Sequence, residues 1–183
     1  EKKYTISTNI AVLAIGHSAR ETFYMLNEKK VQMERKIFSV GVRIEHKQSM
    51  INRAQYGKFA DKLPSAEYKL NVKTSNERGV YTFCMCPGGV VVPSASEENR
   101  LVVNGMSYSK RNLENANSAI LVNVFPDDFE GNSVLAGIEF QRKLEEKAFI
   151  LGGSDYKAPV QLFGDFLNNK VSKKLGNVKP SYL

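Results

Sequence analysis

The stretch Phe38-Ser-Val-Gly-Val-Arg-Ile-Glu45 decides the fold, because apolar and polar side chains alternate along it. Successive residues of a strand point to opposite faces of a sheet. The alternation therefore predicts a strand with one half-buried face, made of Phe38, Val40, Val42 and Ile44. A strand of this kind is typical of an antiparallel sheet.

Further short β segments and two helices are expected downstream of this strand. The β segments are predicted at residues 68–74, 80–86, 90–93, 100–103 and 119–125, separated by turn sequences. A short helix, capped by Ser49, is expected to end at Gly57. The longest helix is expected to open at Ser133, carry Phe140, Leu144, Ala148 and Leu151 on one stripe, and stop at Gly152. The polar stretches 58–66 and 104–117 are interpreted as loops. The predicted class is α+β, a mostly antiparallel sheet with two or more packed helices.

The segment Ala11-Val-Leu-Ala-Ile-Gly-His-Ser-Ala-Arg20 has a different character. The apolar run Ile10 to Ile15 predicts a strand buried on both faces. Ser18 and Glu21 form a capping-box pattern, so a helix is expected to start at about Ala19. A strand, one glycine and a helix N-terminus are typical of a nucleotide-binding crevice, although an ordinary buried strand and helix give the same pattern. We expect residues 1–33 to be a Rossmann-like remnant and residues 34–183 to form a separate domain.

Composition narrows the class of protein. The 183 residues include 42% hydrophobic residues, which is enough for a core. No stretch resembles a membrane span or a signal peptide, so we expect a cytoplasmic protein without membrane contact. The net charge of +7 comes from scattered lysines, concentrated only in residues 170–179, and this pattern argues against nucleic acid as the main partner.

Four longer strings together resemble a largely uncharacterised family of bacterial FAD-dependent dehydrogenases. They are Leu13-Ala-Ile-Gly-His-Ser-Ala-Arg20, Gly41-Val-Arg-Ile-Glu-His46, Phe83-Cys-Met-Cys-Pro-Gly-Gly89 and Asn104-Gly-Met-Ser-Tyr-Ser109. The resemblance continues through residues 115–120, 137–141 and 158–162, and so covers nearly the whole chain. It implies an insert between two FAD-binding halves, with a strand and helix of the first half still attached.

The resemblance also implies a function. The parent polypeptide is expected to be an FAD-dependent oxidoreductase acting on a small-molecule substrate, with this chain as the substrate-facing cap over the isoalloxazine ring. Ile15, Gly16, His17 and Ser18 would contribute part of the FAD site in the parent. The missing FAD-binding halves are the expected partners. The chain alone is expected to be inactive and to hold no FAD.

Cys84 and Cys86 are the most chemically suggestive pair. On a regular strand both thiols point the same way, with their Cα atoms about 6.5 to 7 Å apart. One interpretation is a catalytic or redox pair facing the flavin, and the other is two small buried hydrophobic residues. Two cysteines and two distant histidines do not predict a metal site.

Other polar residues are candidates for contact with the substrate. His46 is suited to orient or protonate a ligand, although a solvent-facing strand end gives the same pattern. Arg43 and Arg53 are suited to grip a carboxylate, or to close surface ion pairs. An amide-rich and hydroxyl-rich group is expected to line a polar pocket, or to serve as turn residues: Asn104, Ser107, Tyr108, Asn115 and Asn117.

Two other functions are compatible with the sequence. The basic surface would suit a module that binds RNA or another anionic ligand, and Cys84 with Cys86 would suit a thiol redox module. A homodimer through the exposed edge of the N-terminal strand is a further expectation.

Overall fold

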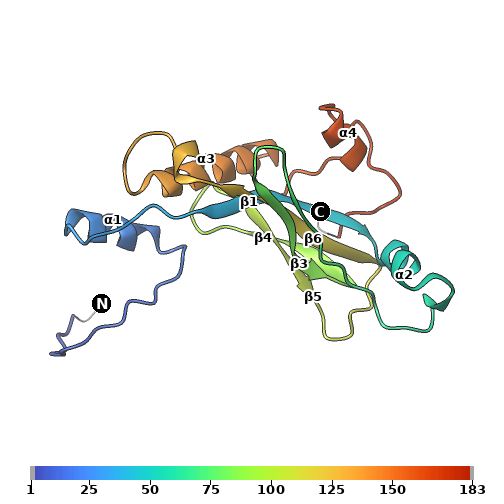
Figure 1. The fold of residues 1–183 in the computed structure, drawn as a ribbon, viewed down its shortest axis with the longest axis horizontal. Helices are drawn as coiled ribbons and strands as arrows, with labels where there is room; N and C mark the ends of the chain where they lie inside the picture. Colours follow the sequence, from blue (N-terminus) through green and yellow to red (C-terminus); the bar gives the residue numbers. More distant parts are fainter. Residues whose placement is uncertain (1–2, 182–183) are drawn as a thin grey trace. The chain divides into compact units, whose positions relative to one another are not determined.

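The computed structural model describes residues 3–181 and has an α+β fold with antiparallel sheets (Figure 1). Its contacts divide the chain into two units, Glu1–Glu34 and Arg35–Leu183. Both sheets belong to the second unit. The predicted fold class is therefore confirmed.

The larger sheet has four strands in the order β1-β6-β3-β2. They are β1 (Phe38–Lys47), β2 (Asn71–Lys73), β3 (Gly79–Cys86) and β6 (Asn115–Val124), and every neighbouring pair is antiparallel. The strands β1 and β6 pair along their whole length, from Phe38 opposite Val124 to Lys47 opposite Asn115. The strand predicted from the alternating sequence is thus the long edge of this sheet.

A second, two-stranded sheet is formed by β4 (Gly89–Ser94) and β5 (Val102–Ser107). The prediction of one loop over residues 104–117 is wrong. Asn104 to Ser107 lie in β5, and Asn115 to Asn117 begin β6, which leaves 108–114 between the strands. Asn and Ser favour turns when their side chains bond to local backbone. Here, strand pairing satisfies the backbone, and Asn115 and Asn117 are buried.

The two predicted helices are present, but both begin differently from the prediction. The helix α2 (Gln48–Tyr56) ends at Gly57, whose φ of 54° is left-handed. Its N-cap is Lys47 rather than Ser49, and no side chain caps it. The helix α3 (Ala136–Leu151) starts three residues after Ser133, whose carbonyl accepts the Ala136 N–H, and it is followed by Gly152.

Shorter helical turns complete this unit. They are η1 (Gly57–Phe59), η2 (Pro126–Asp128) and α4 (Phe163–Leu167), of which α4 was not predicted. Within residues 3–181, no helix has both the length and the apolar character needed to cross a bilayer.

The first unit contains α1 (Arg20–Glu28), which follows Ala19 as expected. The predicted strand at residues 10–15 is wrong, since these residues have no regular structure. Ile10, Val12 and Leu13 are more than half exposed. A strand requires neighbours for its N–H and C=O groups, and no strand in residues 3–181 pairs with this run. The expected capping box is also absent, because no side chain caps α1.

Three phenylalanines form the aromatic core of the second unit. Phe38 stacks on Phe129 with ring centroids 5.1 Å apart, and Phe140 packs against both rings. Val124 and Ala136 are buried in the same cluster, which Val40 also contacts. This cluster anchors α3 to the end of the sheet where β1 begins.

The same face of the sheet continues as an open apolar surface, here called the aliphatic face. It comprises Val40, Val42, Val72, Val80, Ile120 and Val122, on all four strands. Four of these valines form one cross-strand row, in the order Val40, Val122, Val80 and Val72. The exposed fractions are 50% for Val42 and 61% for Val72. The predicted alternation is correct, but the middle of this face is not buried.

The aromatic core provides a test of the fold. Phe129→Ala removes a ring that is only 6% exposed, and we expect the free energy of unfolding to fall by about 3–5 kcal/mol. The matched control Phe163→Ala, at a ring that is 55% exposed, should change it by only about 0.5 kcal/mol. Urea denaturation followed by tyrosine fluorescence measures both values. Equal losses for the two variants would show that the core lies elsewhere.

Candidate functional site

Most of the candidate residues meet where β1 and β3 end and β6 begins. We call this region the polar end and define it by Arg43, His46, Cys86, Asn115, Asn117 and Ser118. In the antiparallel register, His46 is opposite Ala116 and Cys86 is opposite Asn117. Cys84 and Ser107 border the same region. The structure therefore brings together residues that are far apart in the sequence, such as Arg43 and Asn117, which are 74 positions apart.

Arg43 lies on the face of the sheet opposite the aliphatic face. Its Nη1 donates to Asn117 Oδ1 at 2.7 Å and to the carbonyl of Cys84 at 3.3 Å. Gly105 of β5 packs over this pair so closely that a Cβ would overlap both Arg43 Nη1 and Asn117 Oδ1. The Arg43 guanidinium is thus held between the two sheets by the protein itself.

The His46 side chain lies on the side of the sheet that carries the aliphatic face, and it is only 8% exposed. Its Nε2 is 2.8 Å from the hydroxyl of Tyr68, which also lies beside the fully buried Ser118. Burial lowers the pKa of His46 and is only partly opposed by nearby backbone carbonyls and Glu45. Burial likewise raises the pKa of Tyr68. A solvent-facing strand end, one of the two interpretations of His46, is therefore wrong.

The two cysteines do not share one face, contrary to expectation. The register shifts between Phe83 and Cys86, and Cys84 has a left-handed φ of 46°. This irregularity leaves Cys84 exposed and Cys86 buried, and both are free. The Cys86 thiol donates to the carbonyl of Cys84 at 3.2 Å. Burial raises the pKa of Cys86, although Arg43 opposes the shift, so its nucleophilic thiolate is disfavoured.

The C-terminal segment is tied to the polar end. Asn115 Nδ2 donates to Glu45 Oε1 at 2.9 Å and to the carbonyl of Lys179 at 2.8 Å. The N–H of Ser181 donates to Glu45, and the N–H of Val91 in β4 donates to Ser181 Oγ. These long-range contacts carry no signal in the sequence. The same is true of Tyr68, which was missed as the partner of His46.

Several buried polar atoms here have no hydrogen-bond partner among the described residues. They are Arg43 Nε, His46 Nδ1, Asn115 Oδ1 and Asn117 Nδ2. Native proteins satisfy most buried polar atoms with protein groups or ordered water, so these four atoms are candidate points of contact for groups from outside the described residues. No group of three or more His, Cys, Asp or Glu in residues 3–181 is arranged to hold a metal ion.

The remaining candidates lie outside the polar end. Asn104 Oδ1 accepts the N–H of the adjacent Gly105, and Tyr108 is 59% exposed. Ile15, Gly16, His17 and Ser18 belong to the first unit, where Gly16 makes a left-handed turn with φ of 75°.

Comparison with known proteins identifies the family to which the chain belongs. Residues 37–183 match the family described as "FAD-dependent protein, C-terminal domain-like". The chain belongs to this family. The FAD-dependent C-terminal-like domain therefore occupies most of the chain. Over 180 residues, the chain is also 58% identical to a protein of Clostridium beijerinckii named "Uncharacterized protein". That match covers 97% of this chain and 34% of the relative, so the chain spans about a third of the relative's length.

The packing of Gly105 against the polar end of the FAD-dependent C-terminal-like domain can be tested by mutation. Gly105→Ala forces the Arg43–Asn117 hydrogen bond to break or β5 to shift, and we expect a loss of about 1–3 kcal/mol in the free energy of unfolding. Gly164→Ala in α4 is the matched control, because its Cβ meets no atom within 4 Å. Urea denaturation should separate the two variants. A neutral Gly105→Ala would mean that the two sheets are not tightly packed.

The burial of His46 predicts a pH dependence of stability. The folded-state pKa of His46 is below the ordinary value of 6.5. Between these two pKa values, the unfolded chain therefore binds more protons than the folded chain does. The stability contributed by neutral His46 is complete above pH 6.5 and declines as the pH falls toward the folded-state pKa. His46→Gln should flatten this decline in urea titrations, whereas the exposed His17→Gln should retain it. Parallel curves for His46→Gln and the unmodified chain would contradict this assignment.

Proposed function

We propose that this chain is the substrate-facing domain of a larger FAD-dependent oxidoreductase, in which it lies over the flavin. The observation that carries the proposal is the open aliphatic face, bordered by His46 and Tyr68. Membership of an FAD-dependent family supports it, and so does the clostridial relative, about two thirds of which lies outside the matched stretch.

The aliphatic face has the properties of a covered surface. The four-strand row of valines is apolar, and Val42 and Val72 are at least half exposed. A contiguous exposed apolar patch is typical of a binding or interaction site in a protein that is otherwise polar on its surface. We infer that the remainder of the polypeptide covers this face and encloses the reacting groups between the two parts.

The residues of this chain fit a planar cofactor at that position. The aliphatic face offers an apolar sheet surface on which a ring could stack, and the Tyr68 hydroxyl contacts His46 at its polar border. By contrast, on the opposite face of the polar end Gly105 packs directly against Arg43 and Asn117, so a ring cannot lie on that pair. The valines would exclude water, and Tyr68, held by His46, would orient a polar group of the substrate. A bound flavin supplies the electron transfer itself.

The first unit is proposed to contribute to the flavin site only within the complete enzyme. Gly16 makes an open turn, and no atom of residues 3–181 beyond its chain neighbours lies within 4 Å of its Cβ position. Within residues 3–181, no strand pairs with residues 10–15, and the sequence contains no G-x-G-x-x-G motif. We therefore expect the isolated chain to hold no FAD.

Flavin retention tests this proposal. The full-length clostridial relative, with its matched stretch exchanged for this sequence, should show the visible absorbance of a flavin after gel filtration, whereas the isolated chain should be colourless. Val72→Lys places a charge on the aliphatic face and should expose the flavin, with a several-fold increase in quenching of its fluorescence by iodide. Val171→Lys, at a side chain that is 88% exposed, is the matched control.

Two results would contradict the proposal. A colourless full-length protein would refute the cofactor, and equal quenching in both lysine variants would refute the position of this domain over the flavin. The RNA-binding and thiol-redox alternatives stay predictions.

A further inference from the structure

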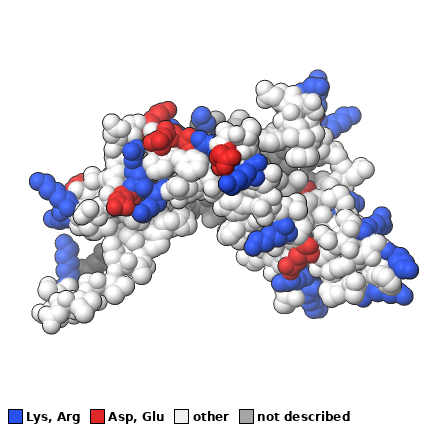
Figure 2. Space-filling model, in the orientation of Figure 1, with Lys and Arg blue, Asp and Glu red and all other residues white. Residues whose placement is uncertain are grey.

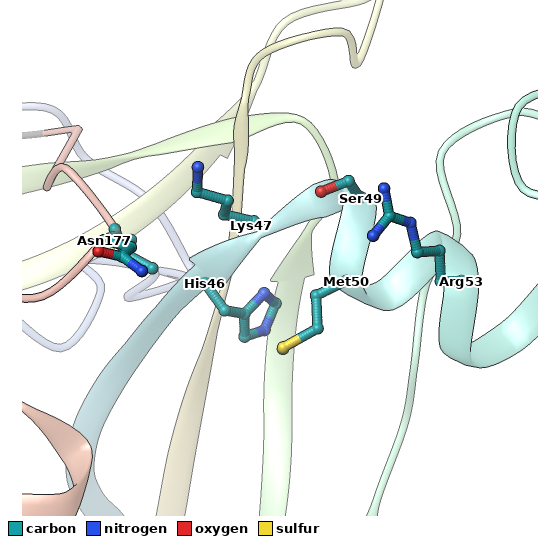
Figure 3. A pocket seen from close by; sticks show the side chains of 7 residues that line it. His46, Lys47, Ser49, Met50, Arg53 and Asn177 are labelled. Carbon is teal, nitrogen blue, oxygen red and sulfur yellow. The ribbon is translucent and has the colours of Figure 1, made fainter.

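We propose that a pocket beside α2 binds the carboxylate of a small organic acid. The pocket has a volume of about 360 Å³ and lies between the end of β1, the start of α2 and the C-terminal segment (Figure 3). Its lining contains no acidic residue and consists of His46, Lys47, Ser49, Met50, Arg53, Asn177 and Val178.

The N-terminus of α2 supplies backbone donors. This nine-residue helix has no side-chain cap, and the N–H of Gln48 donates to the carbonyl of Glu114 at 2.9 Å. The next two N–H groups, of Ser49 and Met50, have no acceptor within the helix because they lie in its first turn. Both residues line the pocket. The positive end of the helix dipole favours an anion at this position.

His46 is a second and independent indication of a ligand. The residue is more than nine-tenths buried, its Nε2 contacts Tyr68, and its Nδ1 has no partner in residues 3–181. Figure 3 shows its ring turned to the same side as Met50. When the Tyr68 hydroxyl donates to Nε2, the neutral ring carries its proton on Nδ1. Nδ1 is then a buried donor for which an acceptor oxygen of the ligand is the natural partner.

Arg53 provides the charge. Lys47 is already paired with Glu114 at 3.1 Å, whereas Arg53 forms no ion pair with the described residues. Lys and Arg side chains cover the end of the second unit where α2 lies (Figure 2). A guanidinium presents two parallel N–H groups that match a carboxylate. From the sequence, Arg43 and Arg53 are the arginines suited to bind a carboxylate. Of these two, Arg53 is the one whose guanidinium is available to a ligand.

The apolar residues of the lining determine which non-ionic part of a ligand fits the pocket. Met50, which is 53% exposed, and Val178 give the pocket an apolar wall. A short hydrocarbon chain would bury surface against this wall, which a bare phosphate ion cannot do. The binding of a carboxylate depends on this chain alone, and only its identification as the enzyme's substrate class rests on the proposed function.

Titration of the 183-residue chain with hexanoate tests the site. We expect the backbone amide signals of Ser49 and Met50 in ¹⁵N NMR spectra to shift and saturate with hexanoate. Hexanol and inorganic phosphate, which each carry only half of the required chemistry, should bind at least tenfold more weakly. Equal affinity for hexanol would refute the anion site, and tighter binding of phosphate would refute the apolar wall.

Variants identify the residues responsible. Arg53→Gln should weaken hexanoate binding about tenfold, as expected for loss of a charge-assisted pair, and Arg53→Lys should weaken it less. Lys62→Gln removes an exposed positive charge outside the pocket and should change affinity less than twofold. Unchanged binding in Arg53→Gln would overturn the proposal. A colourless full-length enzyme would refute the proposed function while leaving a positive hexanoate titration intact.

Discussion

The pairing of β1 with β6 is the constraint on which the rest of the second unit depends. Ten residue pairs fix the register from Phe38 opposite Val124 to Lys47 opposite Asn115. A shift by one residue would exchange the two faces of the sheet. The same register places Phe38 in the aromatic core, Val42 on the open aliphatic face and His46 against Tyr68. It also places Arg43 on the opposite face, within reach of Asn117.

The two faces of this sheet have different roles because they are covered differently. One face is closed over the polar end by the β4–β5 hairpin, and Gly105 permits the close approach to Arg43 and Asn117. Several buried polar atoms there have no hydrogen-bond partner among the described residues. The other face is open over its valines. The open valines are the feature that, under the proposed function, the rest of the polypeptide would cover.

Local irregularities determine which side chains are available. The register shift before Cys86 separates the two thiols, so that one is exposed and the other buried. The uncapped start of α2 leaves backbone donors at a pocket, and the C-terminal segment closes that pocket from the other side. Each of these irregularities is small. Together they determine which thiols and backbone N–H groups are exposed at the polar end and at the pocket.

The sequence by itself determined the α+β class, the strand at 38–45 and the glycine that ends α2, because side-chain periodicity and backbone freedom are local properties. It also indicated most residues of the polar end. It was wrong about residues 10–15, whose apolar run suits a strand but lacks a partner, and about 104–117, whose polar residues belong to paired strands. Only the tertiary structure decided that Tyr68 meets His46, that Arg43 is enclosed while Arg53 is open, and that Cys84 and Cys86 separate. The physical reason is that these outcomes depend on hydrogen bonds and packing between residues far apart in the chain, which no local pattern records.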